Sequence, residues 1–323
     1  MRRFSKIFLS AILINAVAVS CAKKNVQPDY RAPMRDLVER ISQKAKADHP
    51  GFLIIPQNGL ELMNNDADTA SSPNVAYVSA IDGVGQEELF YGYENHDDKI
   101  TPQTEHNSML SWCRYANDHG KKVLVTDYCY SPLFVTDSYV SNHAQHFISY
   151  AADHRELDDI ATNVPYGMNN ANIDSLSSAQ NFLYLIDPSQ YETKEAMIAA
   201  ISTTNFDALI IDMDFNDQAL TASDVQQLKV KANGGRRKVI CYFSIGEAED
   251  YRFYWKPSWY AEQPSFIVSA DPDWVNNYYV KYWDQQWQDI IYGGSDSYLQ
   301  RILNAGFDGA YLDLVNAYEV FEK

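Results

Sequence analysis

Polar residues stand at the ends of apolar runs at several points along the chain, and carboxylates predominate among them. The set comprises Gln57, Asn58, Asp82, Glu87, Asp127, Tyr128, Asp212, Asp214, Glu247, Glu249 and Asp313. Carboxylates gathered at one place suit acid/base cleavage of a glycosidic bond, which needs one protonated and one ionised carboxyl. They would also suit Ca²⁺ or Mg²⁺, but no histidine stands at a strand end, so no metal site and no cofactor are predicted. Each single carboxylate has a plain structural alternative, which is to cap a helix or to pair with an arginine.

Asp313 is the strongest candidate among these residues. It lies in the apolar context YLDLV. Desolvating a charge in such a context is costly, so a carboxylate without a function is not expected there. Glu87 follows two glycines, and we interpret its surroundings as a loop just beyond a strand that bends the side chain over the site. Glu88, the next residue, is an alternative candidate for the same role on the basis of its position alone. Asp308 is assigned to the turn before the last strand, at the end opposite the site.

Eight mostly apolar runs, separated by segments of helical length, are predicted to be strands. They cover residues 52–55, 75–81, 123–127, 147–152, 182–186, 208–212, 239–243 and 309–315. Helices are expected to start at Ser223 and finish near Gly234, and to end at Gly120. Apolar strands that alternate with helices favour a parallel sheet covered by helices, and eight of them favour a closed (β/α)8 TIM barrel. Because the active site of such a barrel lies at the carboxyl ends of the strands, the fold would gather the candidates.

The order of the elements is unusual, because a helix precedes the first strand and none is predicted after the last. Apolar residues recur at helical spacing after Pro33, and the helix they predict would cover the strand at 309–315. Residues 169–180, NNANIDSLSSAQ, are polar without periodicity, the composition of a flexible joint. We expect a single barrel domain over residues 33–323.

Length, composition and net charge limit the classes of protein to which this chain could belong. With 323 residues, 46% of them hydrophobic, the chain is long enough to bury one large core. A net charge of -17 argues against nucleic acid, whose phosphates require clustered lysine and arginine. The expected partner is therefore neutral or cationic.

The N-terminal segment resembles a bacterial lipoprotein signal. Basic residues precede an apolar stretch over residues 7–19, which is too short for a membrane span, and small residues then lead to Cys21 as in a lipobox. We expect residues 1–21 to be the signal peptide, with a lipid on Cys21, and residues 22–32 to be a tether. The protein would sit in the bacterial cell envelope, at the outer membrane, in the periplasm or on the surface, attached to membrane by its lipid alone. A plain signal peptide with a chance cysteine is the alternative.

Five longer blocks carry a resemblance to a known family. They are CYFSIGEAEDYRFYW at 241–255, NNYYVKYWDQQWQDII at 276–291, GFDGAYLDLVNAYE at 306–319, GFLIIPQNGLEL at 51–62 and IDGVGQEELFYG at 81–92. These blocks resemble the signatures of glycoside hydrolase family 114, TIM-barrel proteins of the endo-α-1,4-polygalactosaminidase type. In that family the YLD block lies in the first half, and the QNG and IDG blocks follow it. The reversed order here implies a circular permutant, cut after the YLD strand and rejoined through residues 169–180.

The resemblance implies a role for each matching residue. Asp313 is similar to the nucleophile of a retaining double displacement and Glu87 to the general acid/base, a pair expected about 5 to 5.5 Å apart. The sugar subsites would be lined by Asp212, Glu247, Arg252, Gln57, Asn58, Asp127 and Tyr128. Glu247 would hold the cationic amino group of a galactosamine unit. The implied substrate is an α-1,4-linked galactosamine or N-acetylgalactosamine polysaccharide, or its oligosaccharides, cleaved by endo action.

One position departs from the family pattern. Asn316 stands where family members carry an aspartate, three residues beyond Asp313. If that aspartate tunes the nucleophile or binds an amino sugar, the amide would change specificity or abolish cleavage. The alternative function is therefore a non-catalytic, glycan-binding surface lipoprotein with a degenerate glycosidase site.

Overall fold

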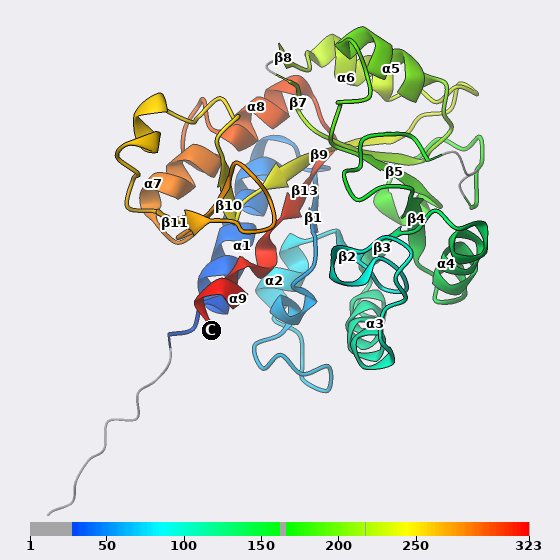
Figure 1. Ribbon diagram of the computed structural model, residues 1–323, viewed down its shortest axis with the longest axis horizontal. Helices are drawn as coiled ribbons and strands as arrows, with labels where there is room; N and C mark the ends of the chain where they lie inside the picture. The colour runs from blue at the N-terminus through cyan, green and yellow to red at the C-terminus, as the bar shows by residue number, and fades with distance from the viewer. Residues whose placement is uncertain (1–27, 162–165, 217, 323) are drawn as a thin grey trace, which may run out of the picture.

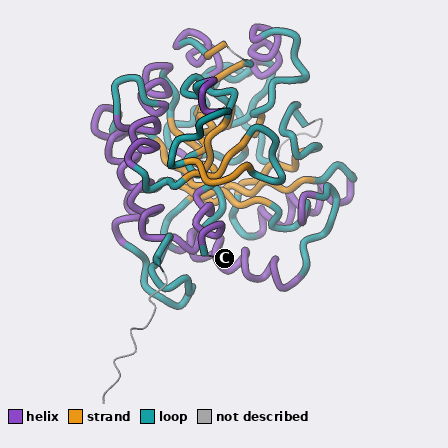
Figure 2. The backbone as a smooth tube through the Cα atoms, turned by 60° about the vertical axis from the view of Figure 1, so that its left-hand side comes forward, coloured by secondary structure: helices purple, strands orange, loops and turns teal. Residues whose placement is uncertain are grey.

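Eight parallel strands form the centre of the molecule, and the helices lie outside them (Figures 1 and 2). The computed structural model describes residues 28–161, 166–216 and 218–322. The central strands are β1 (Leu53–Pro56), β2 (Gly83–Glu87), β3 (Lys122–Tyr128), β4 (Ile148–Ala152), β5 (Phe182–Leu185), β6 (Ala208–Ile211), β9 (Lys238–Ser244) and β13 (Gly309–Asp313). Almost every residue in them is buried, as the predicted parallel strands require. Seven of the eight predicted strands are confirmed.

The central strands form two parallel sheets with the orders β1-β13-β9-β6-β5 and β2-β3-β4. A parallel bridge between Gln57 and Gly85 joins the end of β1 to β2. On the other side, the rings of Tyr150 in β4 and Phe182 in β5 lie 6.1 Å apart. This α/β arrangement is consistent with a TIM-barrel-like glycoside hydrolase fold. Closure of the barrel and circular permutation stay predictions.

The helices form the outer layer. They are α1 (Arg31–Asp48), α2 (Val75–Ala80), α3 (Gln103–Asp118), α4 (Pro132–Ala144), α5 (Lys194–Ser202), α6 (Ala222–Leu228), α7 (Gln285–Gln288), α8 (Tyr298–Ala305) and α9 (Tyr318–Phe321). Helix α1 buries Met34, Leu37, Val38 and Ile41 along one face and packs against both α2 and α8. It therefore lies between the helix before β13 and the helix after β1, where it covers the sheet beside β13.

Smaller elements are inserted among the strand connections. The chain between β6 and α6 carries the hairpin β7 (Asp214–Phe215) and β8 (Gln218–Ala219). The longer connection from β9 to β13 carries an antiparallel sheet of β10 (Glu247–Glu249), β12 (Asn277–Val280) and β11 (Ile267–Ala270). This second sheet forms the lobe at the left of Figure 1.

The predicted strand at residues 75–81 is wrong, because these residues form helix α2. The Asn74 side chain accepts a hydrogen bond from the backbone N–H of Tyr77 at 3.0 Å and caps the helix. The strand of this region is instead β2, which is rich in glycine and so lacks the usual composition of a strand. A Cβ at Gly85 would overlap the hydroxyl of Tyr311, so the inner face of β2 has no room for a side chain there. Glu87 is therefore the last residue of a strand and does not stand in a loop.

Helix α6 also differs from its prediction. Thr221 is the N-cap, and its side chain and that of Asp224 exchange hydrogen bonds with backbone N–H groups in a capping box. The helix ends at Leu228, before the predicted end near Gly234. Helix α3 ends at Asp118, two residues before Gly120, whose φ of 74° is the left-handed value that glycine adopts readily.

Residues 169–180, predicted to be a flexible joint, contact a buried ion pair. Lys231 Nζ and Asp207 Oδ1 lie 2.5 Å apart, with both side chains fully buried. Asn169 Nδ2 donates to Asp207 Oδ2 at 2.9 Å, and the backbone N–H of Gln180 donates to the same oxygen at 2.8 Å. Lys231 Nζ also donates to the Ala171 carbonyl at 2.9 Å. The two ends of this segment are therefore fixed to the same charged pair.

The predicted signal peptide, Cys21 and most of the tether at 22–32 lie outside the described residues. Within the described ranges, no helix combines the length and the apolar character needed to cross a membrane. Cys113, Cys129 and Cys241 are free and buried, and they pack as small apolar groups.

Candidate active site

Glu87 is held at the carboxyl end of β2 by two hydrogen-bond donors. The Tyr128 hydroxyl, from the end of β3, donates to Glu87 Oε1, and Asn58 Nδ2, just after β1, donates to Oε2 at 2.8 Å. Asn58 Oδ1 in turn accepts from the Glu87 backbone N–H at 3.1 Å. Three adjacent strands thus fix the position of one partly buried carboxylate.

Asp313 is held in the same manner at the carboxyl end of β13. The Tyr242 hydroxyl of β9 donates to Asp313 Oδ2 at 2.6 Å, and the backbone N–H of Leu314 donates to Oδ1 at 2.7 Å. Leu314 adopts a φ of 59°, which is unfavourable for a branched side chain. Its carbonyl lies so close to Gly246 that a Cβ at that glycine would overlap it.

The charge of Glu87 acts on Asp313. Burial raises the pKa of Asp313 to about 7, and the next largest cause is the charge of Glu87. Hydrogen bonds from Tyr242 and Leu314 act in the opposite direction, because they favour the ionised form. Asp313 therefore exchanges its proton near neutral pH, which suits acid/base work on a glycosidic bond.

Two further tyrosines line the barrel beside this pair. Burial raises the pKa values of Tyr184 and Tyr311, and the charges of both Asp313 and Glu87 add to the increase. The Tyr184 hydroxyl donates to Gln57 Oε1 at 2.8 Å, which places the predicted subsite residue Gln57 in the buried part of the site. The sequence analysis overlooked these tyrosines and Tyr242. Tyr242 and Tyr311 each stand two residues before a polar strand end, Ser244 and Asp313, and this spacing was a usable signal, whereas Tyr184 stands in a strand that ends on Leu185 and has no such signal.

Three non-glycine residues near the pair adopt a left-handed backbone conformation. Asn58, Glu88 and Leu314 have φ values of 59°, 58° and 59°, and they follow the ends of β1, β2 and β13. Non-glycine residues rarely adopt this conformation, and such strain gathers at functional sites.

Glu88 points to a different partner from Glu87. Arg155, in the loop after β4, forms an ion pair with Glu88 Oε1 at 2.6 Å. The guanidinium of Arg155 also lies 3.9 Å from the ring centroid of Tyr128, the residue that donates to Glu87. Of the two adjacent acids, Glu87 is the one that joins the site, and Arg155 supports the tyrosine that holds it.

Asp127, a predicted subsite residue, lies beneath the surface of the site. Its Oδ1 accepts from the backbone N–H of Phe90 at 2.8 Å and of Tyr91 at 3.2 Å. Its Oδ2 accepts from Ser138 at 2.6 Å and from Asn142 at 3.1 Å. The side chain is completely buried, so the structure places Asp127 as a brace for the loop after β2.

Arg252 and Asp212 form a charged cluster with other acids. Two guanidinium nitrogens of Arg252 bind the Asp212 carboxylate at 2.7 and 2.6 Å, and Arg252 Nε binds Glu249 at 2.6 Å. Asp214 lies 3.5 Å from the same guanidinium, and burial followed by the charge of Asp212 raises its pKa to about 6. One cation is thus surrounded by three acids.

Glu247 is the first residue of β10 in the second sheet, near enough to Asp313 to be affected by its charge. Burial raises the pKa of Glu247 to about 10, with its hydrogen bond to Asp271 and the charges of Asp271 and Asp313 as further causes. Asn277 Nδ2 donates to Oε2 at 3.1 Å, whereas Oε1 has no hydrogen-bond partner among the described residues. Glu247 is therefore protonated at neutral pH in the free protein and shares its proton with Asp271.

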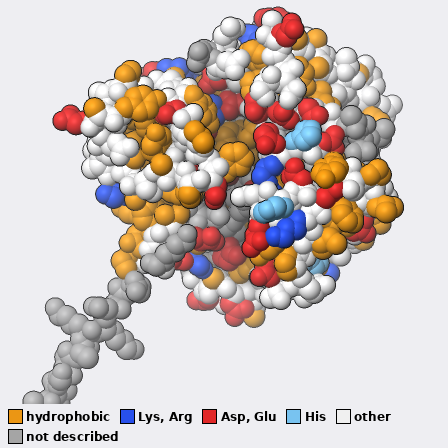
Figure 3. Space-filling model, viewed as in Figure 1, with side chains coloured by type: hydrophobic (Ala, Val, Ile, Leu, Met, Phe, Trp, Pro, Cys, Tyr) orange, Lys and Arg blue, Asp and Glu red, His pale blue; other side chains and the backbone are white. Residues whose placement is uncertain are grey.

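Asn316 borders a cavity of about 160 Å³. The cavity is also lined by Asn58, Gln86, Glu61 and Trp112, so it adjoins the amide that binds Glu87, but neither Glu87 nor Asp313 lines it. Amides, a carboxylate and an aromatic ring are the groups that contact sugars in proteins. Figure 3 shows a hollow between the lobe of the second sheet and the rest of this face, with acidic side chains around it.

Comparisons with known proteins give matches over part of the chain. Residues 170–323 match the model of Glycoside-hydrolase family GH114; Asp313 lies within this range and Glu87 lies outside it. An uncharacterized protein of Thermotoga maritima is 34% identical over 149 residues, which are 46% of this chain and 45% of the relative. Uncharacterized proteins of Methanocaldococcus jannaschii and Deinococcus radiodurans are 34% identical over 161 residues and 36% identical over 125 residues, covering 50% and 39% of this chain. The matched regions span 45%, 44% and 38% of these three relatives, less than half of each.

Proposed function

We propose that this chain, whose residues 170–323 match family GH114, is a glycoside hydrolase with Glu87 and Asp313 as its catalytic pair. The observation that carries the proposal is the placement of two tyrosine-bound carboxyls at the carboxyl ends of parallel strands. The charge of Glu87 adds to burial in raising the pKa of Asp313 to about 7. One carboxylate that attacks and a second carboxyl that donates and takes up a proton are what a retaining mechanism needs.

The proposed reaction is a retaining double displacement. Asp313 attacks the anomeric carbon while protonated Glu87 gives its proton to the leaving oxygen, and Glu87 then takes a proton from the water that hydrolyses the glycosyl-enzyme. Protonation of Glu87 removes the charge that raises the pKa of Asp313, while Tyr242 and Leu314 continue to favour ionised Asp313.

We propose an amino-sugar polymer, α-1,4-linked galactosamine or N-acetylgalactosamine, as the substrate, cleaved internally. The surplus of acids around the pair supports a cationic ligand: Glu247 and Asp271 lie beside Asp313, and Asp212, Asp214 and Glu249 surround one arginine. An ammonium group next to Glu247 would favour its ionised form, so binding would release the proton that Glu247 shares with Asp271. Glu247→Gln should weaken binding of deacetylated oligomers only. Equal losses for acetylated and deacetylated oligomers would contradict the amine-binding role.

The test of the catalytic pair is hydrolysis of partly deacetylated α-1,4-galactosaminogalactan, followed by the release of reducing ends. Asp313→Asn and Glu87→Gln should each lower the rate by at least about a hundredfold, the usual effect of losing an acid/base group. Glu88→Gln is the matched control, because Glu88 adjoins Glu87 and pairs with Arg155 instead. It should keep most of the activity. Equal product from wild type and both site variants would refute the assignment.

A non-catalytic glycan-binding protein is the second candidate, and the amide at Asn316 beside the cavity favours it. Oligosaccharide binding without any hydrolysis, in wild type and in Asn316→Asp alike, would establish this alternative. Hydrolysis that appears only in Asn316→Asp would identify a degenerate catalytic site.

We also propose that the chain is a circular permutant. The family match starts at residue 170, at the edge of the predicted joint, and covers the half that contains the YLD strand. A rearranged chain with ends at the joint, joined between residues 323 and 28, should fold and keep the activity. Failure of this variant to fold, when the parent folds under the same conditions, would count against permutation.

Attachment to the bacterial cell envelope through a lipid on Cys21 is our proposal for localisation. The basic start, the short apolar stretch and the small residues before Cys21 support it. Radiolabelled palmitate should enter the wild-type protein in a bacterial host and should not enter Cys21→Ser. Equal labelling of both would exclude this lipid site.

A further inference from the structure

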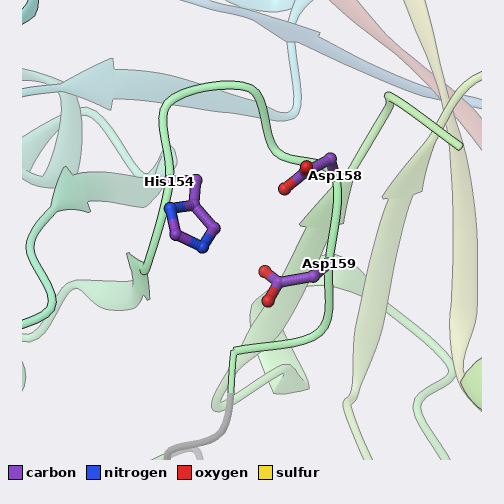
Figure 4. A group of neighbouring side chains, drawn as sticks. All are labelled: His154, Asp158 and Asp159. Carbon is purple, nitrogen blue, oxygen red and sulfur yellow. The ribbon is translucent and has the colours of Figure 1, made fainter. Parts of the chain in front are cut away.

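A second group of ligand-type side chains lies outside the catalytic pair, in the loop after β4. His154, Asp158 and Asp159 each offer one ligand atom, and these atoms all lie within 4.8 Å of one another. Figure 4 shows the imidazole and the two carboxylates facing one another across the loop. The sequence analysis expected no metal site because it considered strand ends, whereas these residues stand in the loop that follows one.

The backbone holds this loop in a defined shape. The N–H of Leu157 donates to the His154 carbonyl at 3.3 Å and closes a turn, and Leu157 has a φ of 54°. The Leu157 carbonyl accepts from the N–H groups of Ile186 and Asp187 at 3.0 and 3.3 Å, just beyond β5. The turn is therefore docked on the neighbouring strand before any ligand binds.

Asp158 provides the observation that indicates a cation. The residue is only 8% exposed, and its Oδ2 accepts from Gln190 Nε2 at 2.7 Å. Its Oδ1 is buried and has no hydrogen-bond partner among the described residues. Leaving a carboxylate oxygen buried and unpaired is costly, and a bound cation would remove the cost.

Asp159 brings a second acid to the same place. Its carbonyl accepts from the Tyr150 hydroxyl at 3.4 Å, which ties the residue to β4. Burial raises the pKa of Asp159, with the charges of Asp153 and Asp158 as further causes and His154 acting in the opposite direction. The crowding of acids beside a histidine is the charge arrangement that a divalent cation stabilises.

We propose that His154, Asp158 and Asp159 bind a divalent metal ion, with Zn²⁺ as the ion that fits best. One imidazole nitrogen and two carboxylate oxygens form a mixed donor set that suits Zn²⁺, whereas Ca²⁺ and Mg²⁺ prefer oxygen alone. Three protein ligands leave a fourth position for water. The ion would also steady Arg155, which follows His154 in the chain and supports Glu88 and Tyr128.

Calorimetric titration of the metal-free full chain with ZnCl₂ tests the site, and MnCl₂ and CaCl₂ serve as further arms. Wild type should bind one Zn²⁺, and His154→Ala and Asp159→Asn should each weaken binding by at least about tenfold, since even outer partners of a metal ligand contribute that much. His49→Ala is the matched control, because His49 is an exposed histidine at the end of α1, and it should bind like wild type.

Two additional readouts keep the result clear. Zn²⁺ should raise the melting temperature of wild type and not that of Asp158→Asn, because only a ligand of the folded state stabilises it. X-ray absorption of the zinc complex should show nitrogen and oxygen donors and no sulfur. The absence of binding at millimolar Zn²⁺, wild-type affinity in the variants, or a preference for Ca²⁺ over Zn²⁺ would each overturn the proposal.

Discussion

Replacing Glu87 by glutamine should lower the pKa of Asp313. At about 5 Å and an effective dielectric constant of about 20, two negative charges repel by about 3 kcal/mol, or about 2 pKa units. Burial is the largest cause of the increase from 3.8 to about 7, and the hydrogen bonds from Tyr242 and Leu314 act in the opposite direction. Without the Glu87 charge, the pKa of Asp313 should therefore fall from about 7 toward its ordinary value, by up to about 2 pH units.

The acidic limb of the pH–rate profile reports this change. Asp313 must be ionised to attack, so kcat/KM is lost as the pH falls through the pKa of Asp313 in the free enzyme. An aryl glycoside of a galactosamine oligomer with a dinitrophenolate leaving group needs no general acid, so Glu87→Gln keeps a measurable first step on it. Because the pKa falls in the variant, the acidic limb should move to lower pH, by up to about 2 pH units.

Glu88→Gln separates this effect from a general change of charge. It removes the same formal charge one residue away, yet Glu88 pairs with Arg155 and is not among the causes of the Asp313 shift. Its acidic limb should coincide with that of wild type. An unmoved limb in Glu87→Gln, or equal shifts in both variants, would refute the coupling between Glu87 and Asp313.

Three further variants test other parts of the structure. Asp313→Asn should raise the melting temperature at about pH 8 and leave it nearly unchanged at about pH 4. The reason is that the folded state binds the Asp313 proton more tightly than the unfolded state does, so the wild type loses stability as the pH rises through this range. Equal effects at both pH values would contradict this. Lys231→Met breaks the buried pair with Asp207 and should cost about 3 to 5 kcal/mol of unfolding free energy, measured in urea. Lys99→Met breaks an exposed pair and should cost less than about 1 kcal/mol. Similar costs for the two variants would contradict the role of burial. Gly85→Ala should destabilise by about 1 to 3 kcal/mol through overlap with the Tyr311 hydroxyl, and a neutral effect in the same denaturation assay would show that Tyr311 yields easily.

Sequence reasoning located the strands that are apolar on both faces, because burial on both sides leaves a clear pattern. It missed β2, because position 85 in this strand must lack a side chain. Gly85 leaves room for the hydroxyl of Tyr311, a residue more than two hundred positions away in the chain. No local pattern contains that information. The capped helix α2 was mistaken for the strand because Val75 and its neighbours are β-formers by composition.

The candidate site was predictable in its residue types and only partly in its arrangement. A carboxylate at a strand end signals a possible site, but the sequence does not reveal which partners it meets. Asp127 meets four donors beneath the surface, whereas Glu87 meets a tyrosine and an amide at the site. The difference arises from contacts between separate strands and helices, which only the fold supplies.

The close approach of Gly246 to the carbonyl of Leu314 limits how this protein can diversify. The backbone N–H that orients Asp313 belongs to Leu314, so a larger side chain at position 246 would disturb the orientation of the acid without touching it. Libraries that randomise the segment after β9 should therefore spare position 246 and vary exposed positions such as Tyr251. Among natural sequences, changes at these two positions are expected to arise together.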